Sequence, residues 1–136
     1  MKKIAFISGP IQGMENEQSY REAIGKICAR LGYETVDPWL REKVIYRGDE
    51  WCWWTKVPAA GFVERDLRDI ERCDVLIAFL PKLSAGTCME LFFAKRQGKR
   101  VITISGMDAL SPWILVHSDR VLRSIEELED ALKQTS

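Results

Sequence analysis

Short apolar runs alternate with longer segments of mixed polarity from one end of the chain to the other. The apolar runs are nearly continuous, which is typical of strands buried on both faces of a parallel sheet. We expect strands at residues 4–7, 33–36, 75–80, 101–104 and, at an edge, 120–122. We expect helices at residues 17–31 and 59–72, over a stretch that opens in residues 84–91 and reaches Gly98, and after Ser124. This alternation predicts one α/β domain over residues 1–136.

Each predicted helix has one apolar face. Four apolar side chains recur at helical spacing in the first helix and should face the sheet, namely Tyr20, Ile24, Ile27 and Leu31. Gly32 is typical of a residue that ends such a helix. The buried stripe of the helix at residues 59–72 should consist of Val63, Leu67 and Ile70. Ser124 and Glu127 have the spacing of a capping box at the start of the last helix.

One acidic side chain falls inside the apolar face of the helix at residues 59–72. At 3.6 residues per turn, Asp66 lies between Val63 and Ile70 on the inward side. Because an unpaired buried charge is costly, this carboxylate needs a partner. The helix runs antiparallel to the strand that follows, so Asp66 should lie near the carboxyl edge of the sheet, where α/β proteins bind ligands. It is either a buried salt-bridge partner or one of two carboxylates in a catalytic site.

A second carboxylate, Glu90, lies in the segment 84–91 between two predicted strands. We expect it in the first turn of a helix that starts at the same edge of the sheet. There the helix macrodipole favours the charged form, as a nucleophile requires. A structural alternative is a second capping box, in which Thr87 begins the helix and Glu90 only binds a backbone N–H.

Two loops are expected at this edge. The first, residues 8–14, follows the first strand, where backbone N–H groups often hold phosphates, and it contains Gly9 and Gly13. An ordinary strand-to-helix turn is the alternative. The second loop, residues 105–112, contains Ser111, whose hydroxyl either contacts a ligand or begins a turn.

Charge and composition argue against several classes of binding partner. Twenty basic and 20 acidic residues balance, so nothing indicates a nucleic acid or an anionic membrane as a partner. The four cysteines have no zinc or CxxC spacing, and reduced thiols in the cytoplasm are the simplest interpretation. The single histidine, His117, cannot form a His-rich metal site, and we expect it to be structural or at the surface. The first residues lead directly into a strand rather than a signal peptide, and no segment is long and apolar enough to span a bilayer. We expect no metal and no cofactor.

Aromatic residues crowd the segment 38–57. They are Trp39, Tyr46, Trp51, Trp53 and Trp54. This segment is either a lid whose rings stack on a planar base, or a cover over the core or a subunit contact.

Together, Asp66, Ser84 and Glu90 in successive strand–loop–helix units resemble the nucleoside 2-deoxyribosyltransferase superfamily. Within it the chain is most similar to the 2′-deoxynucleoside 5′-monophosphate N-glycosidases. The resemblance covers nearly the whole chain and is strongest over residues 4–13, 64–80 and 84–104. It implies a Rossmann-like, five-stranded, mainly parallel sheet of order 2-1-3-4-5 with helices on both faces. It also implies a homodimer with sites near the subunit interface.

The resemblance implies roles for five residues. Glu90 matches a nucleophile that attacks C1′ of the sugar and expels the base, and Asp66 matches an aspartate on the base side that manages its proton. Ser84 matches a serine of the nucleotide hydrolases, where transferases of free nucleosides have an aspartate that binds the 5′-hydroxyl. An aspartate would repel a phosphate dianion, whereas a serine donates a hydrogen bond to it. Ser111 matches a serine that reaches the phosphate in the neighbouring subunit, and Gly86 belongs to the matching block around Glu90.

Three departures from the family pattern bear on the substrate. Phe6 stands where many members have a tyrosine that orients the glutamate, which leaves room beside the 2′ position for a ribonucleotide such as CMP. Pro10 and Gln12 replace a serine and an arginine of the hydrolases. Since proline has no N–H and glutamine no charge, phosphate binding should depend on other groups of the loop. We expect these contacts from the backbone of Gly9, Ile11, Gln12 and Gly13 and from Ser84.

The sequence therefore predicts hydrolysis of the N-glycosidic bond of (deoxy)nucleoside 5′-monophosphates, with release of the free base and (deoxy)ribose 5-phosphate. Transfer of the deoxyribosyl group to another base by the same residues is one alternative. A nucleotide-binding sensor without catalysis is the other, because Rossmann-like folds serve many functions.

Overall fold

The structure, a computed structural model, describes residues 2–42 and 59–134. Its strands are β1 (Ile4–Ser8), β2 (Glu34–Val36), β3 (Val75–Phe79), β4 (Arg100–Ile104) and β5 (Arg120–Leu122). Its helices are α1 (Ser19–Arg30), α2 (Trp39–Glu42), α3 (Ala59–Arg72), α4 (Ala85–Arg96), α5 (Pro112–Val116), the 3-10 turn η2 (Ile125–Glu127) and α6 (Leu128–Lys133). All neighbouring strands pair in parallel, in the order β2-β1-β3-β4-β5. The predicted α/β fold and strand order are confirmed.

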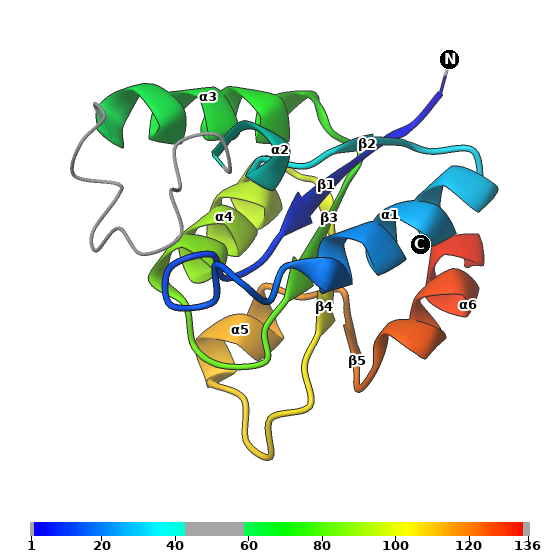
Figure 1. Ribbon diagram of the computed structural model, residues 1–136. Coiled ribbons are helices and arrows are strands. Elements are labelled where there is room, and N and C mark those ends of the chain that lie inside the picture. Colours follow the sequence, from blue (N-terminus) through cyan, green and yellow to red (C-terminus); the bar gives the residue numbers. More distant parts are fainter. Residues whose placement is uncertain (1, 43–58, 135–136) are drawn as a thin grey trace.

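The sheet separates two halves of the hydrophobic core. Helices α1 and α6 cover one face, and α3 and α4 cover the other (Figure 1). Because side chains alternate along a strand, Ile7 packs with Ile24 of α1 on the first face. Phe6 packs on the opposite face with Ile70 of α3 and Leu91 of α4.

Two predicted helix boundaries are confirmed by their hydrogen bonds. After α1, Gly32 has a φ of +85°, and the N–H of Tyr33 donates to the carbonyl of Cys28 at 3.0 Å. This is the bond pattern of a Schellman motif, in which glycine adopts the left-handed conformation most easily. At the start of the last helical segment, the N–H of Ser124 donates to the Glu127 carboxylate at 2.9 Å, as a capping box requires.

Two short helices differ from the sequence prediction. Helix α5 occupies a region predicted to be a loop and connection; Ser111 is its N-cap and accepts from the N–H of Trp113 at 3.2 Å. Helix α2 begins at Trp39, the only aromatic residue of the tryptophan-rich segment that lies within the described residues. The predictions for the other aromatic residues of that segment fall outside them.

The described thiols are free. Cys28 and Cys73 are buried in the core, and Cys88 is half-buried. Burial raises the pKa of Cys28 and of Cys73 to about 11, so both are held as unreactive thiols at neutral pH. Within the described part of the chain, no helix combines the length and the apolar character needed to cross a membrane.

Candidate active site

A cavity of about 630 Å³ opens at the carboxyl edge of the sheet. It is lined by the loop after β1, by the first half of α3, and by the loop that leads into α4 together with the first two turns of that helix. Phe62, Val63 and Leu67 form its apolar wall on α3. The prediction that Val63 is buried was wrong: its side chain is 45% exposed, because it borders the cavity instead of the core.

A second hollow, of about 720 Å³, lies near the C-terminal ends of α1 and α6. Its described lining includes Lys2, Lys3 and Lys133 and contains no carboxylate. The cavity at the carboxyl edge, in contrast, is lined by both Asp66 and Glu90. It is therefore the better candidate for acid–base or nucleophilic chemistry.

Glu90 reaches the cavity from the second turn of α4. The helix begins at Ala85 after the N-cap Ser84, so the prediction of Glu90 in the first turn was one turn too early. Ser8, at the end of β1, donates a hydrogen bond of 2.6 Å from its Oγ to Oε1 of Glu90. Ser8 is buried, so this bond fixes the direction of the carboxylate. Sequence reasoning missed Ser8, although alternation along β1 places it on the same face as Phe6, the face that α4 covers.

The start of α4 also contradicts the capping-box alternative for Glu90. Ser84, not Thr87, is the N-cap. Its Oγ accepts from the backbone N–H of Thr87 at 3.4 Å and from Oγ1 of Thr87 at 3.1 Å. A hydroxyl whose lone pairs are both engaged still has its own hydrogen to donate, and Ser84 lines the cavity. The structural role that we considered for Glu90 thus belongs to Ser84, which remains a potential donor to a ligand.

Asp66 is a salt-bridge partner, one of the two roles that the sequence left open, and it also lines the cavity. Its side chain is buried at the middle of α3. Arg41 of α2 forms an ion pair with it, with 3.1 Å between the guanidinium nitrogen and Oδ1, and a second pair of 2.7 Å with Asp69. Each carboxylate oxygen can accept more than one hydrogen bond, so Asp66 can bind a donor group in the cavity while it pairs with Arg41.

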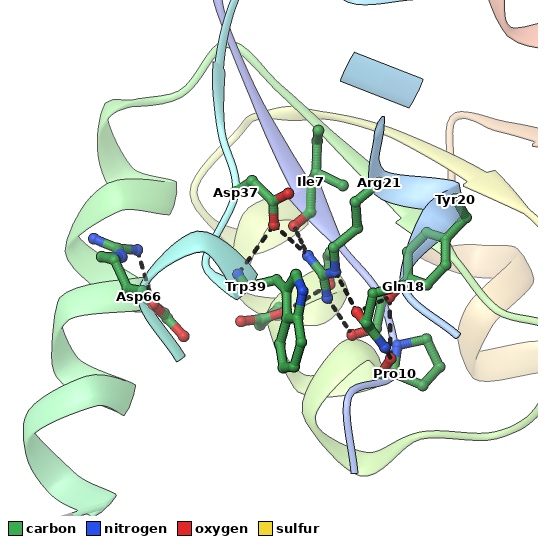
Figure 2. A network of polar contacts seen from close by, with 12 residues as sticks. Ile7, Pro10, Gln18, Tyr20, Arg21, Asp37, Trp39 and Asp66 are labelled. Atoms are coloured by element: carbon green, nitrogen blue, oxygen red, sulfur yellow. Dashed lines mark hydrogen bonds and ion pairs between the residues drawn. The ribbon is translucent and has the colours of Figure 1, made fainter. Parts of the chain in front are cut away.

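Arg21 holds the loop after β1 in place through hydrogen bonds to backbone carbonyls, a role that no sequence pattern predicted. Its buried guanidinium donates to the carbonyls of Ile7 at 3.1 Å and Gly9 at 2.8 Å, and to Oδ1 of Asp37 at 2.7 Å. Figure 2 shows this guanidinium between β1, α1 and the segment leading into α2. The same Asp37 oxygen accepts from the N–H of Trp39 at 3.0 Å. Arg21 therefore ties the loop after β1 to the helix that carries Arg41.

Two further side chains of α1 and its N-cap hold the loop. Gln18 donates from its side-chain amide to the carbonyl of Pro10 at 2.8 Å, and Tyr20 donates from its hydroxyl to the same oxygen at 3.0 Å. Burial raises the pKa of Tyr20 to about 12, so the phenol stays a donor at physiological pH. The carbonyls of Gly9 and Pro10 thus accept hydrogen bonds from side chains of α1 and of its N-cap residue. These bonds hold the loop in place.

One N–H of this loop already binds an anionic oxygen. Gly13 has a φ of +83°, and its N–H donates to Oε1 of Glu15 at 3.0 Å. A carboxylate on a backbone N–H in a glycine-containing turn resembles the way such turns bind phosphate oxygens. The contact is local to the turn, because Glu15 lies two residues after Gly13.

The structure brings most of the predicted site residues to one cavity. Its lining contains Gly9, Ile11, Gln12, Asp66, Ser84, Gly86 and Glu90. Gly13 adjoins this lining, since a β-carbon placed on it would lie 3.2 Å from Nζ of Lys82, which lines the cavity. Phe6 is not brought there, because it is fully buried in the core beneath α4. Ser111 is not in the lining either, and its hydroxyl caps α5.

An exposed apolar surface adjoins the cavity on α4 and α5. It consists of Met89, Phe92, Trp113, Leu115 and Val116. Met89 also lines the cavity. His117, expected to be structural or at the surface, is half-buried beside this surface; Nδ1 lies 2.6 Å from the carbonyl of Trp113, and the ring contacts the rings of Phe92 and Trp113.

Comparison with known proteins adds the family. The model of the nucleoside 2-deoxyribosyltransferase family matches residues 5–114 of the chain, which include every residue described above at the cavity. No curated protein matches the chain in sequence.

Solved structures share the fold at low identity. A 2-deoxyribosyltransferase from Bacillus psychrosaccharolyticus is 17% identical with a TM-score of 0.71, and the alignment covers 93% of this chain and 90% of that one. A CMP N-glycosidase from Clostridium botulinum is 20% identical with a TM-score of 0.59, and 96% and 98% are covered. A CheY-like response regulator receiver domain from Methanospirillum hungatei is 15% identical with a TM-score of 0.58, and 98% and 91% are covered. Since a receiver domain fits as well as a glycosidase, the fold alone does not define the activity.

Proposed function

The chain belongs to the nucleoside 2-deoxyribosyltransferase family, and from this premise we propose that it hydrolyses the N-glycosidic bond of (deoxy)nucleoside 5′-monophosphates. The observation that carries the proposal is the hydrogen bond of 2.6 Å by which Ser8 orients Glu90 in a cavity that also contains Asp66. An ionised, oriented carboxylate is what a covalent glycosidase mechanism needs.

In the proposed reaction Glu90 is the nucleophile. Its carboxylate attacks C1′ through an oxocarbenium-like transition state, and the C–N bond breaks with its electron pair leaving on the base. The base takes a proton from solvent. Water then attacks C1′ of the glycosyl ester, releases the sugar 5-phosphate and frees the Glu90 carboxylate. The sum is one water consumed for one base released.

Asp66 holds the base in this proposal. Its carboxylate, which pairs with Arg41, accepts hydrogen bonds from N–H groups on the edge of the base. After the base departs, the same carboxylate is placed to accept a proton from the attacking water. The apolar side chains of α3 pack against the planar ring.

The proposal that the substrate carries a 5′-phosphate rests on Ser84 and the first loop. Ser84 offers a neutral donor at the start of α4, where an aspartate would repel a phosphate. Gly9, Ile11 and Gln12 line the same cavity, and we propose that their backbone N–H groups bind the phosphate. A 5′-monophosphate is thus favoured over a free nucleoside.

A homodimer is part of the proposal. Met89, Trp113 and Val116 are each more than 70% exposed on adjacent helices, which is unusual for large apolar side chains on a free surface. A two-fold axis through this surface would place α5 of one subunit beside the cavity of the other, since Met89 belongs to both the surface and the cavity. Ser111, at the start of α5, would then contribute to the partner's phosphate site.

The direct test is base release from a panel of nucleoside 5′-monophosphates, ribo and deoxy, with the matching free nucleosides alongside. Release from monophosphates alone supports the proposal and identifies the base and sugar. Release from free nucleosides, with a new nucleoside formed when a second base is added, would instead support the transferase alternative. Binding without release from any of them would support a sensor.

A further inference from the structure

Lys82 lies on the loop between β3 and α4, across the cavity entrance from the loop after β1. It lines the same cavity as Ser84 and Glu90. Its position relative to the first loop follows from Gly13, where an added β-carbon would lie 3.2 Å from Nζ of Lys82. The ammonium group therefore sits against the turn whose N–H already binds the Glu15 carboxylate.

Two arginines near the cavity, Arg21 and Arg41, already have acidic partners. The Arg21 guanidinium donates hydrogen bonds to the carbonyls of Ile7 and Gly9, to the Gln18 side chain and to Asp37. Arg41 is bound to two aspartates. In contrast, no carboxylate of the described residues forms an ion pair with Lys82. The described lining contains two cationic side chains, Arg21 and Lys82, and of these only Lys82 has no acidic partner among the described residues.

Residues with three kinds of donor group lie at this end of the cavity. Gly9, Ile11 and Gln12 have backbone N–H groups, Ser84 has a hydroxyl, and Lys82 has an ammonium group that lies close to Gly13. Glu15 accepts from the N–H of Gly13 at an exposed position, so a ligand oxygen can replace it at small cost. Backbone N–H groups with a lysine above them form a recurrent arrangement for a phosphate monoester, which offers three acceptor oxygens and about two negative charges.

We infer that Lys82 is the specificity-determining residue for the 5′-phosphate. The inference rests on the proposed function and goes beyond it, because it assigns the discrimination between nucleotide and nucleoside to one side chain. Lys82 supplies a positive charge for the phosphate, which the neutral Gln12 in the first loop cannot supply. It acts on binding of the phosphate and does not touch the glycosidic bond.

The test compares Lys82→Met with Lys82→Arg and with Lys26→Met. Lys26 is an exposed lysine on α1 that pairs with Glu22, so it controls for the loss of one positive charge. Initial rates of base release are measured for a nucleoside 5′-monophosphate and its free nucleoside at low and high salt. Lys82 is exposed, so the folded state should be kept, and a thermal melt verifies this.

We expect Lys82→Met to raise KM for the monophosphate by about 10- to 100-fold, as for loss of a charged hydrogen bond. Its kcat for the monophosphate should stay the same, Lys82→Arg should recover most of the loss in KM, and Lys26→Met should behave as wild type. Added salt should raise KM of the wild type more than that of Lys82→Met. A KM for the monophosphate that is unchanged in Lys82→Met would overturn the inference and leave the proposed hydrolysis standing. A wild-type enzyme that prefers free nucleosides would overturn both.

Discussion

The hydrogen bond from Ser8 to Glu90 gives the sharpest single prediction. Replacing Ser8 with alanine removes one oxygen atom from a buried position and leaves the rest of β1 intact. The lost bond is short, at 2.6 Å, and its acceptor is a carboxylate. Bonds of this type contribute about 1.5–3 kcal/mol. If the bond orients the nucleophile in the transition state, the variant should lose about 10- to 150-fold in kcat with little change in KM.

Ser105 provides a matched control for that variant. It is as buried as Ser8, and it follows β4 as Ser8 ends β1. Its Oγ donates to the carbonyl of Leu80 at 2.7 Å, and it does not line the cavity. Ser105→Ala should lower the free energy of unfolding by about 1 kcal/mol and leave kcat unchanged. If Ser8→Ala turns over within twofold of the wild type, or if both variants lose activity equally, the proposed orientation of Glu90 by Ser8 is wrong.

Three further predictions concern the base site, the core and the surface. Replacing Arg41 with methionine removes the cation beside Asp66, so base release should fall by about tenfold in steady-state assays. The free energy of unfolding should fall by about 1–3 kcal/mol, because the mostly buried carboxylates of Asp66 and Asp69 both lose their cation. An unchanged rate would show that the role of Asp66 does not depend on Arg41. Burial raises the pKa of Cys28 and of Cys73 from 9.0 to about 11, so the unfolded chain loses these protons first, and stability that is full below pH 9 should fall as pH rises toward 11. Urea titrations at pH 8 and pH 10.5 should differ by about 2 kcal/mol for each thiol, and equal values would contradict the shift. Trp113→Asp should convert a dimer to a monomer in sedimentation velocity, and a monomeric wild type would refute the dimer.

Much of the fold could be predicted because the sequence pattern is strong. Continuous apolar runs identify β1, β3 and β4, which lie at the centre of the sheet and are covered on both faces. The helical period alone placed Asp66 on the inner side of α3. Helix α5 was missed because it has only five residues, and one turn of helix gives no periodicity to detect.

A residue of the candidate site could be predicted only where its position within a single strand–loop–helix unit indicates its role. Glu90 was found because it follows a strand and sits on the helix after it. Arg21 and Arg41 were missed because each contacts residues of another element that is distant in the sequence. Arg21 donates to Asp37, and Arg41 forms an ion pair with Asp66. No local pattern marks an arginine that will donate to the carbonyls of another strand.

The measurement that tests the central claim most directly is base release by the wild type and by Glu90→Gln, side by side, from the best nucleoside 5′-monophosphate. Glutamine keeps the shape of the side chain but cannot form the glycosyl ester. Circular dichroism and nucleotide binding verify that the variant is folded and still binds. We predict that the wild type releases the base and that Glu90→Gln loses at least about 10³-fold in kcat while it retains binding. Turnover by Glu90→Gln close to that of the wild type would contradict the account.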